Sequence, residues 1–160
     1  MSFQSIIDQS MDDWKKQLDA NLNSAYNCTR AAGKAMLQNP NGGSIINIAS
    51  IEAQIPILGH SYYNVAKAGM EMLTRSAAQE FGPNHIRVNS ISPGLIWKQG
   101  LDAEWPAGVK LWTEHTPLHS LGTTEDVANA CLFLSSPLAK WITGANLLID
   151  GGFSVRDIYY

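Results

Sequence analysis

The sequence predicts an α/β fold in which helices flank a parallel sheet. Three segments carry apolar residues at steps of three or four, which is typical of amphipathic helices. They alternate with three short segments that read as strands, and the first of these, residues 44–49, is expected to be buried on both faces. Strands that alternate with helices favour βαβ units and therefore a parallel sheet. At 160 residues, with no internal repeat or linker, the chain is expected to form one domain or part of one.

The boundaries of the expected elements follow from capping and turn residues. Ser10 precedes two acidic residues and is a suitable cap for the first helix, which ends at a turn rich in asparagine and glycine. Gly82-Pro83 ends the second helix. We expect helices over residues 11–36, 61–81 and 124–134, and strands over residues 44–49, 86–91 and 145–150. The tryptophan-rich stretch 95–121 has no clean period, so no element is predicted there.

Composition narrows the classes of function. Only 16% of the residues are charged and the net charge is -3, which argues against a nucleic-acid partner. No apolar run reaches the roughly 18 residues of a membrane span, and the first residues do not read as a signal peptide. Cys28 and Cys131 lie in apolar helical patterns and are expected to be buried, reduced thiols. These features favour a soluble cytoplasmic protein.

Tyr63 and Lys67 form the pair most suggestive of chemistry. Side chains four residues apart lie on one face of a helix, within reach of each other. An ammonium fixed beside a phenol lowers the pKa of the phenol from its usual value of about 10 and makes it a usable acid or base. Taken alone, the pair also fits an ordinary helix surface.

Ser50 and Pro93-Gly94 give this pair a context. Each follows the carboxyl end of an expected strand, and open parallel sheets bind ligands outside those strand ends. Ser50 is therefore suited to hold a substrate oxygen beside the Tyr63 hydroxyl. A serine directly after a strand is also common as a helix cap or turn residue.

With these residues in order, the chain resembles the short-chain dehydrogenase/reductase superfamily over residues 8–153. The separation of Ser50 and Tyr63 by thirteen positions is the spacing usual in that family. The matching segments are Asn21-Leu22, Ile48-Ala49-Ser50, Tyr63 and Lys67 with Ala68-Gly69, Arg87-Val88-Asn89 with Ser92-Pro93-Gly94, Glu125-Asp126-Val127-Ala128, Phe133-Leu134, and Thr143-Gly144 with Asp150-Gly151-Gly152.

The resemblance implies a Rossmann-like sheet and four catalytic roles. Tyr63 would exchange a proton with the substrate oxygen while a hydride moves to or from a nicotinamide, and Ser50 would hold that oxygen. Lys67 would lower the Tyr63 pKa and bind the nicotinamide ribose. Asn21 would anchor a water that relays protons towards Lys67, although from the residues alone it reads as a polar residue that bends a helix.

The same resemblance implies a nicotinamide cofactor, NAD or NADP. Tyr63, Lys67, Pro93, Gly94 and the backbone of Ile96 would form its nicotinamide side. However, the thirteen glycines include no G-x-G-x-x-G, so the strands and glycine-rich turn that open a family member are missing and the binding site is incomplete. We therefore expect an incomplete Rossmann-like domain, residues 1–160, whose first strand exposes an open edge.

Two further groups of residues were considered. Trp97, Trp105 and Trp112 fall where the family has its substrate-covering loop, so they either form an apolar lid or simply pack on the domain. His60 is expected near the mouth of the pocket. His115 and His119 lack a carboxylate or cysteine partner that would complete a metal site, so no metal is expected.

Three functional hypotheses remain open at this point. The leading one is an NAD(P)-dependent oxidoreductase that interconverts a carbonyl and a secondary alcohol of a small molecule. The alternatives are a catalytically silent fragment that only associates, and one half of a split enzyme completed by a separate nucleotide-binding chain. A homo-oligomer, a dimer or tetramer, fits each hypothesis. The identity of the substrate and the direction of the reaction do not follow from the sequence.

Overall fold

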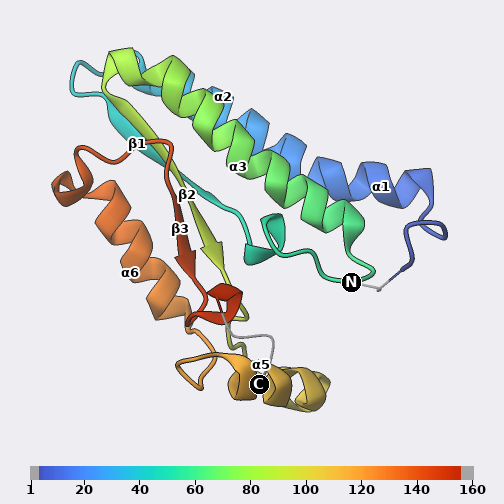
Figure 1. Cartoon of the computed structure of the whole chain (residues 1–160). Helices are drawn as coiled ribbons and strands as arrows, with labels where there is room; N and C mark the ends of the chain where they lie inside the picture. The colour runs from blue at the N-terminus through green and yellow to red at the C-terminus, as the bar shows by residue number, and fades with distance from the viewer. Residues whose placement is uncertain (1–3, 156–160) are drawn as a thin grey trace.

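The computed structural model describes residues 4–155 and contains a parallel sheet of three strands (Figure 1). The strands lie in the order β1 (Gly43–Ile48), β2 (Ile86–Pro93) and β3 (Asn146–Ile149). In the register, Gly43 pairs with Ile86 and Ser90 pairs with Asn146. The expected α/β class and the parallel sheet are confirmed.

The first helical segment is continuous but changes its winding. α1 (Met11–Leu18), the π-helix η1 (Asp19–Asn23) and α2 (Ser24–Met36) follow one another with helical backbone angles at both junctions. The Ser10 hydroxyl accepts a hydrogen bond of 3.1 Å from the Asp13 amide, as a cap does. The single long helix expected over residues 11–36 is therefore confirmed, with a π turn in its middle.

The two other long helices match the sequence prediction closely. They are α3 (Ser61–Phe81) and α6 (Thr124–Ser135), and α6 begins with a reciprocal capping box between Thr123 and Asp126. Within residues 4–155, no helix combines the length and the apolar character that crossing a bilayer requires.

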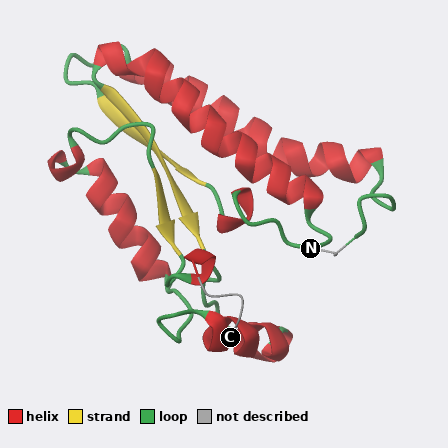
Figure 2. Ribbon diagram, in the orientation of Figure 1, coloured by secondary structure: helices red, strands yellow, loops and turns green. Residues whose placement is uncertain are grey.

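Helices cover both faces of the sheet. α2 and α3 lie on one face and α6 on the other (Figures 1 and 2). Ile45, Ile86 and Val88 pack against α3, whereas Ile91 packs with Leu134 of α6. β2 lies between the other strands and between the helical layers, so the side chains of Ile86, Val88 and Ile91 are fully buried. This coverage on both faces is usual for the central strand of a parallel sheet.

The stretch without a clean period contains two helices, α4 (Leu101–Glu104) and α5 (Pro106–His115). α5 lies beyond the strand arrowheads, at the carboxyl ends of the strands (Figure 2). Its buried residues are only Gly108 and Trp112, so it presents no apolar stripe that a period could reveal. Pro106 in its first turn is compatible with a helix start.

β1 forms one edge of the sheet. It pairs with β2, and no other described residue forms a strand beside it. The exposed fraction of Ile48, at its carboxyl end, is 42%. The open edge expected from the sequence is confirmed, and it is an apolar one.

The prediction of buried cysteines is wrong for one residue and only partly right for the other. Cys28 is exposed, because α2 turns Thr29 and Gly33 towards the rest of the molecule instead. Cys131 is half-buried against the cluster of Ile91 and Leu134, and this burial raises the pKa of its thiol. Both cysteines are free thiols.

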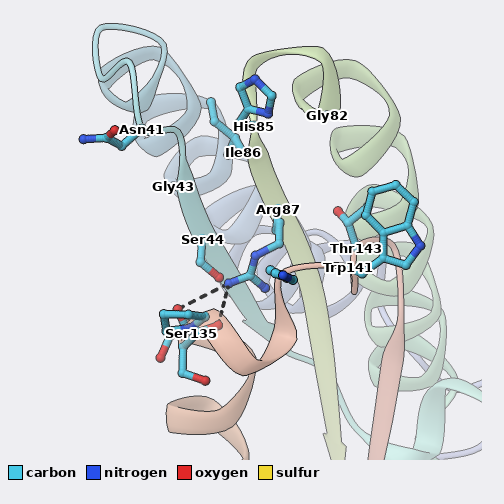
Figure 3. Close-up of a pocket in the computed structure, with 13 residues that line it drawn as sticks. Asn41, Gly43, Ser44, Gly82, His85, Ile86, Arg87, Ser135, Trp141 and Thr143 are labelled. Atoms are coloured by element: carbon cyan, nitrogen blue, oxygen red, sulfur yellow. Dashed lines mark hydrogen bonds between the residues drawn. The ribbon is translucent and has the colours of Figure 1, made fainter.

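Arg87 fastens the end of α6 to β2, beside a cavity at the amino ends of the strands (Figure 3). One guanidinium nitrogen donates to the carbonyl of Leu134 at 2.6 Å, and the other donates to those of Ser135 and Ser136 at 3.3 and 3.4 Å. These carbonyls belong to the last turn of α6, where a cation is favourable. Because the guanidinium is engaged in holding this helix end, we interpret this cavity as structural.

Candidate active site

A second cavity, of about 550 Å³, lies at the opposite ends of the strands. Its polar lining includes Ser50 and Tyr63, and Pro93 and Gly94 contribute from the end of β2. The remaining wall is mainly apolar and comprises Ile51, Ile55, Pro56, Ile57, Leu95, Trp105, Leu111, Trp112 and Phe153. Residues far apart in the sequence thus surround one space at the carboxyl ends of the strands, where parallel sheets bind ligands.

Ser50 is buried, with 8% of its surface exposed, between the end of β1 and the short helix η2 (Ile51–Ala53). Its Oγ accepts a hydrogen bond of 3.2 Å from the Glu52 amide, so it caps η2. The same side chain hydrogen-bonds Tyr63 and lowers the pKa of that phenol. The cap and the contact with Tyr63 are compatible, because one hydroxyl oxygen can accept from the Glu52 amide and still hydrogen-bond to Tyr63.

Lys67 lies one turn beyond Tyr63 on α3, with its ammonium 5.5 Å from the centroid of the tyrosine ring. The ammonium donates a hydrogen bond of 2.8 Å to the carbonyl of Ile48, at the end of β1. Burial lowers the pKa of this ammonium, because a charged group loses solvation there. The predicted proximity of the two side chains is confirmed.

The predicted fall in the Tyr63 pKa does not occur. The pKa is raised above its usual value, chiefly by burial; the hydrogen bond from Ser50 lowers it, and the charge of Glu52 raises it. The physical reason is burial, which disfavours the charged phenolate, while the Lys67 ammonium donates its hydrogen bond to a main-chain carbonyl. The phenol is therefore held in its protonated form.

Asn21 lies in the π-helical turn η1, which packs against α3 where Gly69 leaves room for Leu22. A Cβ at Gly69 would come within 2.9 Å of the Leu22 side chain. The amide nitrogen of Asn21 donates to the carbonyl of Gln17 at 3.1 Å, as a polar residue in a distorted helix does. Its role in a water relay stays a prediction.

The residues expected on the nicotinamide side are only partly together. Pro93 and Gly94 line the cavity, whereas Ile96 lies outside its lining and bridges to Gly122. Gly94 has a steric reason to be glycine, because a Cβ there would come within 3.0 Å of the Asp150 backbone. A side chain at this position would push the two strand ends apart.

The aromatic residues divide between lining the cavity and lying on the surface. Trp105 and Trp112 line the cavity, as a lid would, whereas Trp97 does not and is 49% exposed. Trp112 stacks on Phe153 with ring centroids 3.7 Å apart. Phe153 was missed in the sequence analysis, because nothing near it in the chain indicates that it meets Trp112.

His60 lines the cavity as expected, and its partner Glu52 was missed. His60 Nδ1 lies 3.0 Å from a carboxylate oxygen of Glu52, and the two side chains are only 11% and 14% exposed. The position of Glu52, two residues after Ser50, was the available signal. As for metals, residues 4–155 hold no group of three or more candidate ligands, and His115 Nδ1 lies 2.8 Å from the Leu111 carbonyl.

Comparison with known proteins gives consistent matches along the chain. The family described as enoyl-(acyl carrier protein) reductase matches residues 2–154. The 3-oxoacyl-[acyl-carrier-protein] reductase FabG of Chlamydia pneumoniae is 37% identical over 156 residues, which cover 93% of this chain and 60% of the relative.

Solved structures agree with these matches. An acetoin dehydrogenase from Enterobacter cloacae superimposes with a TM-score of 0.90 at 28% identity, covering all of this chain and 63% of that one. A 4-hydroxyisoleucine dehydrogenase complexed with NADH gives a TM-score of 0.85 at 31% identity, covering 96% of this chain and 65% of that one. The chain thus spans about 60% of the length of these proteins, and its Rossmann-like sheet is incomplete beside theirs. Sequence, fold and the arrangement of Ser50, Tyr63 and Lys67 agree: the chain belongs to the short-chain dehydrogenase/reductase superfamily.

Proposed function

We propose that the protein is an NAD(P)-dependent oxidoreductase that interconverts a carbonyl and a secondary alcohol. The observation that carries the proposal is the convergence of Ser50 and Tyr63 on one cavity, with the Lys67 ammonium buried behind the tyrosine ring. A hydroxyl pair that faces an apolar cavity is suited to hold a carbonyl oxygen and to exchange a proton with it.

In the reductive direction, Tyr63 donates its proton to the substrate oxygen as negative charge develops there. Ser50 holds that oxygen by a second hydrogen bond, and its contact with Tyr63 keeps the two hydroxyls aligned. The raised pKa of Tyr63 fits a proton donor, because the phenol stays protonated at neutral pH. Oxidation of an alcohol would run through the same contacts in reverse.

The chain's residues fit the nicotinamide end of a dinucleotide, which when bound would supply or accept the hydride. An ammonium has three donors, and the Ile48 carbonyl is the one acceptor that Lys67 binds among the described residues, so donors remain for ribose hydroxyls. Pro93, Gly94 and the backbone of Ile96 would flank the ring. Neither NAD nor NADP is favoured, because the chain has no glycine-rich fingerprint with its discriminating residue.

We further propose a cytoplasmic homo-oligomer acting on a small molecule. Its free thiols fit a reducing compartment, and Leu132, Leu138 and Trp141 on and after α6 are 66%, 83% and 96% exposed, as suits a face that another subunit covers. The silent fragment and the split enzyme remain the alternatives. Rescue of activity by a separate nucleotide-binding chain would favour the split enzyme.

Replacing Tyr63 with phenylalanine tests the proposal, because it removes the proton donor and keeps the ring. With NADH or NADPH and a ketone, we expect turnover to fall by about 10²–10⁴-fold, the usual contribution of a positioned acid. Consumption of the reduced nicotinamide measures the rate. Tyr26→Phe, at an exposed position of α2, is the matched control and should retain full activity. Unchanged turnover in Tyr63→Phe would remove Tyr63 from the mechanism.

A further inference from the structure

The cavity contains a second polar site beside the Ser50–Tyr63 pair. Glu52 and His60 both line it, joined by the 3.0 Å contact between a carboxylate oxygen and Nδ1. The ring of His60 meets that of Tyr63 edge-on, with centroids 6.2 Å apart and planes at 64°. The pair therefore lies within the same small space as the reacting hydroxyls.

This site can accept a hydrogen bond and is unfavourable for an anion. A carboxylate only accepts hydrogen bonds, and its contact with His60 holds it in place. Its charge reaches the reacting group, since Glu52 acts electrostatically on the Tyr63 phenol. The described residues that line the cavity include no lysine or arginine to bind a carboxylate or phosphate. A ligand oxygen that donates its proton fits this acceptor, whereas a carboxylate placed beside Glu52 would face a second acceptor and no lysine or arginine.

We propose that Glu52 selects neutral substrates that carry a hydroxyl next to the reacting carbonyl or carbinol, that is, α-hydroxy ketones and the corresponding diols. The hydroxyl donates to the Glu52 carboxylate while the carbonyl oxygen meets Ser50 and Tyr63. The apolar wall formed by residues such as Trp112 and Phe153 contacts the hydrocarbon remainder. This inference rests on the proposed function for the identity of the reacting carbonyl.

Three compounds of equal chain length separate the contributions: 3-hydroxybutanone, butanone and the anionic 2-oxobutanoate. Their binding to the full chain is measured by saturation-transfer NMR, which requires no turnover. We expect 3-hydroxybutanone to bind about tenfold more tightly than butanone, as one hydrogen bond to a charged group implies. 2-Oxobutanoate should bind most weakly. Equal responses to the three compounds, including no response to any, would overturn the inference.

Glu52→Gln removes the charge and keeps the shape of the side chain. We expect the advantage of 3-hydroxybutanone over butanone to shrink and the binding of 2-oxobutanoate to improve. Glu104→Gln is the matched control, because it removes a carboxylate from the ion pair with Lys98, in which each side chain is 62% exposed. This variant should leave the ranking unchanged. A wild-type ranking in Glu52→Gln would show that Glu52 does not select the ligand.

Tyr63→Phe separates failure of this inference from failure of the proposed function. The variant retains Glu52 and His60, so we expect it to rank the three compounds as the wild type does while turnover is lost. Loss of turnover in Tyr63→Phe without any ranking in the wild type would support the oxidoreductase and refute the substrate class. A clear ranking of the three compounds, together with unaffected turnover in Tyr63→Phe, would support the ligand class and refute the proposed role of Tyr63.

Discussion

At the scale of single residues, three features of its environment shift the pKa of Tyr63, and they do not all act in the same direction. Burial raises the pKa of the phenol most, the hydrogen bond from Ser50 lowers it, and the charge of Glu52 raises it. Lys67 acts at the carbonyl of Ile48 and over the ring, at 5.5 Å from its centroid. Each of these contributions is accessible to a separate substitution.

We predict that Tyr63 ionises above pH 10, the usual midpoint of a tyrosine. The difference in phenolate absorbance between the wild type and Tyr63→Phe isolates this transition. Its midpoint should fall in Glu52→Gln, because a negative neighbour is removed, and rise in Ser50→Ala, because the hydrogen bond that favours the phenolate is lost. A midpoint below 10 in the wild type would show that burial and the charge of Glu52 do not outweigh the hydrogen bond from Ser50.

The same shift has a consequence for stability. The pKa of Tyr63 is higher in the folded than in the unfolded state. Its contribution to the free energy of unfolding is therefore fully present below about pH 10 and is lost as the pH rises through the folded-state pKa. Above pH 10, the free energy of unfolding should therefore fall less steeply with pH in Tyr63→Phe than in the wild type.

Ser50, Tyr63 and Lys67, and His60 and two tryptophans at the cavity, could be predicted from the sequence, whereas Glu52 and Phe153 were missed. Ser50, Tyr63 and Lys67 are linked by a strand end and a helical spacing, which are local properties. Phe153 belongs to the site through folding alone, because it joins Trp112 from more than forty positions away, whereas the closeness of Glu52 to Ser50 in the chain was an available signal. The sign of the Tyr63 pKa shift also depended on burial, which spacing does not reveal.

At the scale of secondary-structure elements, Glu71 joins α3 to the sheet. It lies one turn beyond Lys67 and is 7% exposed. Its carboxylate accepts hydrogen bonds from Gln54 Nε2 at 3.1 Å, Ser92 Oγ at 3.0 Å and Asn146 Nδ2 at 2.8 Å. These donors belong to the segment after η2, to β2 and to β3. The helix that carries Tyr63 and Lys67 is thus joined to β2 at Ser92 and to the first residue of β3.

We predict that Glu71→Gln lowers the free energy of unfolding by about 1–3 kcal/mol, the cost of leaving buried donors unsatisfied. The new amide group faces donors and can no longer accept from each of them. Urea unfolding followed by circular dichroism gives the value. Glu80→Gln, at an exposed position of the same helix, should change stability by less than about 0.5 kcal/mol. Equal stabilities of the two variants would show that the buried cluster contributes nothing.

Elements with a clear apolar period could be predicted, and those without one could not. α3 and α6 each bury one stripe of residues, so their bounds follow from spacing and caps. α4 and α5 cover a cavity instead of a continuous core, and α5 buries only two residues. The π turn around Asn21 was equally hidden, since its winding depends on packing against α3.

At the scale of the whole molecule, the cavity lies between the first turn of α3, the segments that follow β1 and β2, and α5. The sheet and its helices are sufficient to build both the Ser50–Tyr63 pair and the Glu52–His60 pair. The chain spans about 60% of the length of its relatives, and β1 forms an open edge of the sheet. We propose that this part of the fold carries the chemistry of hydride transfer to a carbonyl.

Transfer of a labelled hydride tests that claim most directly. The chain is incubated with NADH or NADPH deuterated at the transferable position of the nicotinamide and with each of the three four-carbon ketones. Mass spectrometry then locates deuterium in the product. We expect deuterium on the carbinol carbon of the alcohol in the wild type and at least about a hundredfold less labelled alcohol in Tyr63→Phe. Absence of labelled alcohol from every combination of cofactor and ketone would contradict the claim.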